Sequence, residues 1–129
     1  MYLGIDLGQK TTGLAISEGQ IASPLKTITH KNPDEALQLI LRTIEEENID
    51  TVVLGFVEGK INKLFSDFAQ NLKAQKPDIE LILEDETLTS LQASQLQFKL
   101  SVPKIKRKEK EHEVAAAFIL QSYLDNIND

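Results

Sequence analysis

The stretch that decides the fold is residues 2–17, YLGIDLGQKTTGLAIS, which contains two short apolar runs joined by a turn. In residues 2–7 every second side chain is leucine or isoleucine, the period-two pattern of a β-strand. Residues 8–10, GQK, are typical of a turn, and residues 12–17 return as a second strand. The chain is therefore predicted to open with a β-hairpin, with Asp6 near the end of its first strand.

Outward from this hairpin, the chain predicts one more strand and then a change of period. Residues 25–29, LKTIT, complete three short strands in series, which indicates an antiparallel meander. Asn32 can cap a helix and Pro33 suits its first position, after which apolar residues recur at helical spacing to about Glu47. The remaining predicted elements are strands at 51–55 and 79–83 and helices at 60–76, 88–98 and 109–124.

The order βββαβαβαα predicts an α/β fold with a mixed five-stranded sheet and helices on both faces. The 129 residues are 41% hydrophobic, enough for one core, and we expect a single domain over 1–129. No apolar run approaches the ~18 residues of a membrane span, and the N-terminus lacks signal-peptide features. The absence of cysteine excludes disulfides, thiolate metal sites and a cysteine nucleophile, and it agrees with a cytoplasmic location.

The net charge of −6 argues weakly against nucleic-acid binding, but the basic residues are concentrated in one segment. Residues 99–110, KLSVPKIKRKEK, carry six basic side chains and one acidic one. Such a segment can bind phosphates locally even on an acidic protein. Taken alone, it is more often a solvated, lysine-rich surface loop.

Asp6 is a carboxylate inside an otherwise apolar strand, where burial of a lone charge is costly. It either hydrogen-bonds to the turn at 8–10, or pairs with Lys10, or serves a ligand. Gly4 and Gly8 on either side leave room for a ligand or a backbone segment to approach it closely.

Two further clusters carry candidate chemistry. Glu84-Asp85-Glu86 follows the fifth strand, where ligands collect in α/β sheets, although Glu86 or Thr87 could instead cap the next helix. Glu111-His112-Glu113 lies early in the last helix, with His112 on its apolar side. A lone histidine there is more often structural. The other histidine, His30, lies in a polar segment and suggests no function.

Asp6, residues 84–86 and residues 111–113 come from separate segments that can converge at one edge of the sheet. Carboxylates with an imidazole suit Mg²⁺ or Mn²⁺, and the imidazole favours Mn²⁺. Two such ions about 4 Å apart can activate water and stabilise the leaving oxygen in phosphodiester cleavage.

The sequence resembles the YqgF/RuvX family, described as Holliday junction resolvases and as pre-16S rRNA nucleases. The matching segments are GIDLGQK at 4–10 with GLA at 13–15, ASPL at 22–25 with TI at 27–28, DE at 85–86 with LTS at 88–90, and AA at 115–116 with ILQSYLD at 119–125. The resemblance covers the whole chain in order. It implies an RNase H-like fold and a metal-dependent hydrolase acting in ribosome biogenesis or recombination.

By position, the resemblance implies Asp6 as the first metal ligand and Glu86 as the second acid. His112 stands where the family usually has an aspartate, and resolvases of the related RuvC group can carry histidine in that set. With Glu113 as a substitute ligand and Asp85 as an alternative to Glu86, these residues would hold Mg²⁺ or Mn²⁺. Glu58 is a further candidate ligand.

The chain also departs from the family pattern. Thr11 and Thr87 stand where the family has arginines, which removes two bidentate phosphate contacts. Residues 55–57, GFV, replace a Gly-Leu-Pro segment. The basic residues expected to contact phosphates are Lys10, Lys104, Lys106, Arg107 and Lys108, with Lys60 also available.

Three functions therefore remain open from the sequence. The first is a nuclease for an RNA precursor or branched DNA, either monomeric or, for a two-fold junction, homodimeric. The second is a nucleic-acid-binding or scaffold protein that keeps the fold without cutting, suggested by the missing arginines and by His112. The third is a sugar-kinase or chaperone-type ATPase, because residues 4–8 and Thr11-Thr12 resemble its first phosphate loop. That class needs two such domains, and this chain has the length of one.

Overall fold

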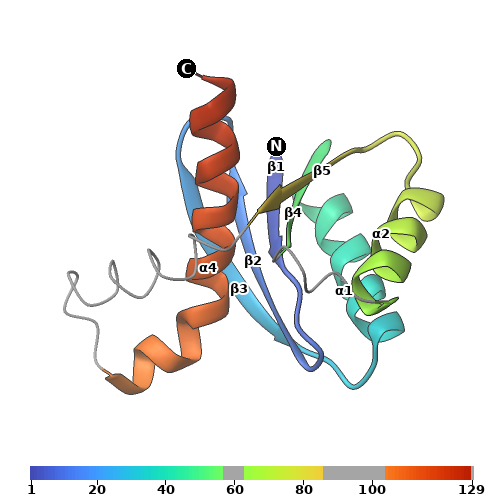
Figure 1. The fold of residues 1–129 in the computed structure, drawn as a ribbon, viewed down its shortest axis with the longest axis horizontal. Helices are drawn as coiled ribbons and strands as arrows, with labels where there is room; N and C mark the ends of the chain where they lie inside the picture. Colours follow the sequence, from blue (N-terminus) through green and yellow to red (C-terminus); the bar gives the residue numbers. More distant parts are fainter. Residues whose placement is uncertain (57–62, 86–103, 129) are drawn as a thin grey trace.

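The computed structural model describes residues 1–56, 63–85 and 104–128, with the backbone alone for 104–110 (Figure 1). Its elements are β1 (Tyr2–Asp6), β2 (Thr11–Ser17), β3 (Ala22–Thr29), α1 (Pro33–Glu46), β4 (Thr51–Phe56), α2 (Lys63–Gln75), β5 (Glu80–Asp85) and α4 (Lys104–Ile127). Within these residues, no helix combines the length and the apolar character needed to cross a membrane.

The five strands form one sheet in the order β3-β2-β1-β4-β5. β1 pairs antiparallel with β2, and β2 with β3, so the predicted meander is confirmed. β4 pairs parallel with β1, and β5 pairs parallel with β4, as helical crossovers require. The carboxyl ends of β1, β4 and β5 therefore lie at one edge of the sheet, which is where Asp6 and Asp85 end their strands.

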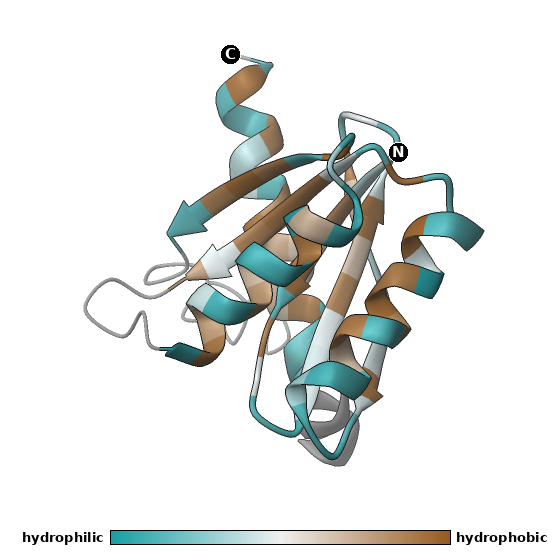
Figure 2. Cartoon of the chain, turned by 90° about the vertical axis from the view of Figure 1, so that its right-hand side faces the viewer, coloured by the Kyte–Doolittle hydropathy of each residue, from teal (hydrophilic) through white to brown (hydrophobic). Residues whose placement is uncertain are grey.

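Helices cover the two faces of the sheet unequally (Figure 1). α1 and α2 pack on one face over a core that includes Leu3, Ile5 and Leu54, all fully buried. Figure 2 shows the apolar sides of these helices turned toward the strands. Of the described helices, α4 covers the other face, where its residues Ala116 and Leu120 are buried against the strands. Because side chains alternate along a strand, Leu3 and Ile5 face α1 and α2 while Gly4 and Asp6 face α4.

The start of α1 follows the sequence prediction. The Asn32 side-chain oxygen accepts a 2.8 Å hydrogen bond from the backbone N–H of Glu35, and Pro33 occupies the first turn. The cap satisfies one of the amide groups that a helix start leaves without a partner. This local signal explains why the boundary at residue 33 was predictable from sequence.

The start of the last helix was predicted wrongly. α4 begins at Lys104, not near Glu109, so most of the basic segment is helical rather than a surface loop. The physical reason is that lysine, arginine and glutamate are good helix formers, so high charge alone does not indicate a loop.

The β3 strand also begins earlier than predicted, at Ala22, and includes Pro24. A proline is tolerated there because β3 is an edge strand, and the β2–β3 register shifts at Leu14/Ala15. The predicted helix at 88–98 lies outside the described residues.

Candidate active site

Asp6 is the last residue of β1 and lies opposite Gly13 of β2. Its side chain is 16% exposed and faces α4. A carboxylate at this depth keeps its charge at low cost only if a cation or hydrogen-bond donors lie close to it. We therefore expect α4, which covers this face, to supply a hydrogen-bond donor or a cationic group to Asp6.

α4 crosses the sheet directly over two glycines. A Cβ atom on Gly13 would collide with the carbonyl group of His112, and one on Gly4 would lie 2.7 Å from the carbonyl oxygen of Ala116. The room predicted at Gly4 is thus taken by helix backbone, one of the two occupants expected, and Gly13 allows the same close approach. Gly8 has a different role, because a Cβ there would collide with the Thr11 carbonyl oxygen within the turn.

The close crossing brings His112 to Asp6. Its Nδ1 atom lies 3.4 Å from Oδ2 of Asp6, and the imidazole is 41% exposed. The two residues are 106 positions apart in the chain, so their proximity depends entirely on the packing of α4 over Gly13. One oxygen donor and one nitrogen donor, partly open to solvent, therefore meet at the carboxyl end of β1.

Glu113 points toward β3, whereas His112 points toward β1. Its Oε2 accepts a 3.4 Å hydrogen bond from the hydroxyl of Thr27 on β3. Thr27, Gly13 and Asp6 form one row across three neighbouring strands, with α4 lying over Gly13. Strands are about 4.8 Å apart, so Thr27 and Asp6 are separated by about 10 Å. The structure therefore does not bring Glu113 to Asp6, although the sequence analysis grouped them.

The acidic triplet is only partly described. Glu84 is held by α4, because the Ser122 hydroxyl donates a 3.0 Å hydrogen bond to its Oε1. In the sheet register Glu84 pairs with Gly55 of β4, one position beyond the Ile5–Leu54 pair, so two strand spacings, or about 10 Å, separate its backbone from that of Asp6. Asp85 ends β5 with an exposed side chain. Glu86, the predicted second acid, lies outside the described residues, as do Thr87, Glu58 and Lys60.

Among the described side chains, no three histidine or acidic residues gather closely enough to hold a metal ion. Asp6 and His112 supply two donors, of the kinds that suit Mn²⁺ or Mg²⁺. A third ligand would have to come from outside the described part, where Glu86 follows the carboxyl end of β5. The pair therefore fits one side of a divalent cation site.

The predicted phosphate-binding residues lie between Asp6 and His112 in the sequence, close to one or the other of them. Lys10 is exposed in the turn between β1 and β2. The backbone of Lys104, Lys106, Arg107 and Lys108 forms the first turns of α4, and Figure 1 shows these turns on the side of the sheet opposite α1 and α2. Lys108 precedes His112 by four residues, which is about one helical turn.

His30 is a residue that the sequence analysis passed over. It follows β3 directly, is 3% exposed, and its Nε2 lies 2.8 Å from the hydroxyl of Thr12, which is fully buried. The signal was present in the alternation of β3, because Ile28 faces the core under α1 and α2, and His30 continues that period.

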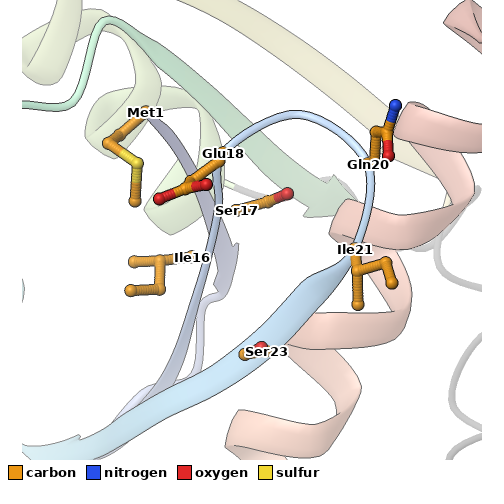
Figure 3. Close-up of a pocket in the computed structure, with 7 residues that line it drawn as sticks. All are labelled: Met1, Ile16, Ser17, Glu18, Gln20, Ile21 and Ser23. Atoms are coloured by element: carbon orange, nitrogen blue, oxygen red, sulfur yellow. The ribbon is translucent and has the colours of Figure 1, made fainter.

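The cavity drawn in Figure 3 contains none of these residues. It measures about 660 Å³ and lies at the opposite end of β2, beside the turn to β3. Its lining residues are Met1, Ile16, Ser17, Glu18, Gln20, Ile21 and Ser23.

One titratable group on the α4 face has a perturbed pKa. Burial raises the pKa of Tyr123 above its usual value, and the nearby Glu80, Tyr2 and Glu84 raise it further. The rings of Tyr123 and Tyr2 lie 6.3 Å apart, which anchors the end of α4 on β1. This part of the interface favours the neutral phenol.

This shift predicts a pH-dependent stability. A raised folded-state pKa stabilises the fold at all pH values below the unfolded value of about 10, and the contribution is lost as pH rises through the folded value. Tyr123→Phe should therefore weaken the decline of the urea midpoint as pH rises above about 10. Equal declines for wild type and variant would contradict the prediction.

A family model described as RuvX, Holliday junction resolvase, matches residues 1–126 of the chain. The chain belongs to the RuvX family. This confirms the resemblance seen in the motifs. Family membership gives no support to the sugar-kinase or chaperone-type alternative.

Two curated relatives of this RuvX-family chain carry the name "Putative pre-16S rRNA nuclease". One, from Staphylococcus haemolyticus, is 36% identical, over 97% of this chain and 95% of the relative. The other, from Onion yellows phytoplasma, is 39% identical, over 97% of this chain and 89% of the relative. The similarity therefore extends over nearly the whole of each protein.

Solved structures with the same architecture include two resolvases. The fowlpox virus Holliday junction resolvase superposes with a TM-score of 0.63 at 14% identity, covering 97% of this chain and 98% of that one. Thermus thermophilus RuvC, solved with a Holliday junction substrate, gives a TM-score of 0.59 at 12% identity, covering 97% and 94%. These similarities confirm the RNase H-like fold of the RuvX-family chain.

Proposed function

We propose that this RuvX-family protein is a metal-dependent nuclease that hydrolyses nucleic-acid phosphodiesters, with maturation of the 16S rRNA precursor as its first candidate reaction. The observation that carries the proposal is the contact of 3.4 Å between Asp6 and His112 at the carboxyl end of β1. The family description and the names of the relatives support nuclease activity. We place the protein in the cytoplasm, acting as one domain over residues 1–129.

The proposed site uses Asp6 and His112 to hold a Mg²⁺ or Mn²⁺ ion, with Glu86 as the third ligand and Asp85 as its alternative. Held by these residues, such an ion would supply a nucleophile at neutral pH and would neutralise charge on the leaving oxygen. Asp6 provides the negative charge that attracts the cation, and its 16% exposure limits competition from bulk water. His112 would contribute an imidazole nitrogen as a ligand.

The basic start of α4 provides the phosphate contacts of this proposal. Because α4 is one helix, Lys104 to Lys108 are joined to His112 by continuous helical backbone. Cationic side chains bound to phosphates release counterions, so their contribution falls as salt rises. Lys10, in the turn after Asp6, is the contact proposed on the other flank.

Replacing Lys104, Lys106, Arg107 and Lys108 by glutamine should weaken nucleic-acid binding and flatten its salt dependence. Each lost phosphate contact on duplex DNA removes about 0.9 from the slope of log affinity against log salt, so the slope should fall by up to about 3.6. Fluorescence anisotropy over a salt series measures it. Arg42→Gln, an exposed site on α1 across the sheet, is the control. Unchanged affinity at low salt would rule out this role.

The test of the function is cleavage of end-labelled substrates by the full chain. The substrates are single-stranded RNA carrying a 16S precursor 5′ extension, duplex DNA and a four-way junction, each with Mn²⁺, Mg²⁺ or EDTA. Metal-dependent cutting supports the nuclease and identifies its substrate. Cutting of the junction alone would favour resolution over RNA maturation, and would predict a symmetric dimer.

A catalytically silent binding protein is the second candidate. It is favoured by His112 and Thr11, which stand where the family resemblance implies an aspartate and an arginine. Binding of RNA or DNA by folded protein, without cleavage of any substrate in either metal, would support this alternative.

A further inference from the structure

His30 and Thr12 form a buried polar pair beneath the turn that follows Asp6. Thr12 belongs to β2 and faces the α1–α2 side of the sheet, while Asp6 faces the α4 side. The pair is 2.8 Å apart between His30 Nε2 and the Thr12 hydroxyl oxygen. Thr12 is 0% and His30 3% exposed, so water does not compete for this contact.

The same pair is tied to both ends of the turn at residues 8–10. The backbone N–H of Gly8 donates to the Thr12 hydroxyl oxygen at 3.4 Å, and the backbone N–H of His30 donates to the carbonyl oxygen of Lys10 at 2.9 Å. A hydroxyl has one proton and two lone pairs, so the Thr12 hydroxyl can accept from Gly8 and also form a hydrogen bond with His30 Nε2, whose direction depends on the imidazole tautomer. One buried histidine thereby fixes the segment that leads from Asp6 to Lys10.

A purely structural role would be served better by another residue. Within the described part of the chain, Nδ1 of His30 is buried and has no hydrogen-bond partner. A buried polar atom without a partner is unfavourable, and an apolar side chain would fill the same space without that penalty. The histidine is therefore best explained by the contact it makes with Thr12.

We propose that His30 is a positioning residue for the nuclease reaction: through Thr12 it holds the turn at 8–10 so that Lys10 meets a substrate phosphate beside Asp6. The inference rests on the proposed function. The His30–Thr12 pair, here called the clamp, lies on the face of the sheet opposite Asp6. It acts through the backbone of the turn rather than by contact with substrate.

The first test is physical and does not require activity. Amide hydrogen exchange of Gly8, followed by NMR, should be protected in the wild type and fast in Thr12→Val and His30→Leu. His30→Gln, whose amide can reach Thr12, should recover part of the protection. If the Gly8 amide stays protected in Thr12→Val, the Thr12 hydroxyl does not hold the turn, and the proposal is wrong.

The second test measures steady-state cleavage. Thr12→Val and His30→Leu should lower kcat/KM by about ten- to a hundredfold, as a displaced site residue does. The matched control is Thr43→Val, another buried threonine, whose hydroxyl donates to the Leu39 carbonyl oxygen within α1. It should lower the melting temperature but leave kcat/KM unchanged. Equal losses of activity in Thr12→Val and Thr43→Val would overturn the positioning role.

A double-mutant cycle connects the clamp to Lys10. If His30 acts by placing Lys10, then Lys10→Ala should raise KM in the wild type and have little further effect in the His30→Leu background. If the effects of Lys10→Ala and His30→Leu on KM are fully additive, His30 does not act by placing Lys10. Absence of cleavage by the wild type would instead refute the proposed function, and Gly8 exchange would still decide whether the clamp exists.

Discussion

Asp6→Asn is expected to abolish metal-dependent cleavage while leaving the protein folded. The substitution keeps the shape of the side chain and removes the charge that lies 3.4 Å from His112. Asp6 is proposed to hold the cation that would stabilise negative charge in the transition state, so its loss should lower kcat by about 10²- to 10³-fold. Single-turnover cleavage of the best substrate, at saturating Mn²⁺, measures the chemical step directly.

The control for this experiment is Asp67→Asn, an exposed aspartate on α2 across the sheet. It removes the same charge without approaching the site and should keep wild-type activity. We also expect Asp6→Asn to match or exceed the wild-type melting temperature. Burial of a charged carboxylate lowers the stability of the fold, and the neutral amide removes that cost. Retained cleavage by Asp6→Asn would refute the proposed site.

Gly13→Ala should be the most damaging single-methyl change in the described structure. Its Cβ would collide with the His112 carbonyl and the Glu113 amide, both of them helix backbone, so no side-chain rotation relieves the clash. Forced overpacking of this kind costs about 3 kcal/mol, and α4 must lift away from β2. Urea denaturation measures the loss of stability.

Gly4→Ala provides a graded comparison for that experiment. Its new methyl group would meet the Ala116 carbonyl oxygen at 2.7 Å and the Leu120 side chain at 2.8 Å, a milder conflict. We expect a smaller loss of stability than for Gly13→Ala, and smaller effects on cleavage because His112 is farther away. A Gly13→Ala variant as stable as wild type would show that α4 does not pack as described.

The parts of the fold that sequence predicted have strong local signals. The alternation of residues 2–17 predicted the hairpin, and the Asn32 cap predicted the start of α1. The start of α4 was missed because helix propensity and high charge give opposite indications over the basic segment. Propensity prevails there, and the helix begins at Lys104.

The site was predictable to a different extent. Proximity of Asp6 and His112 was expected from their placement at one sheet edge, and the geometry agrees. The sequence did not predict that the side chains of Glu113 and His112 contact different strands. Adjacent helical residues point about 100° apart, and the crossing of α4 over Gly13 decides which strand each one meets. His30 was missed because its burial depends on β3 continuing its alternation to the last residue before the turn.

If the proposed phosphate contacts are made, the helical backbone from Lys104 to His112 would hold them at a set distance from Asp6. Eight residues of helix rise by about 12 Å, a length that spans roughly three phosphate steps along one strand of a duplex. Anchoring at the first residues of α4 and cutting beside Asp6 would then be separated by a set number of nucleotides, whatever their bases. The cleavage position would then depend on its distance from a structural feature of the nucleic acid, such as a junction or the end of a helix, and not on the base sequence.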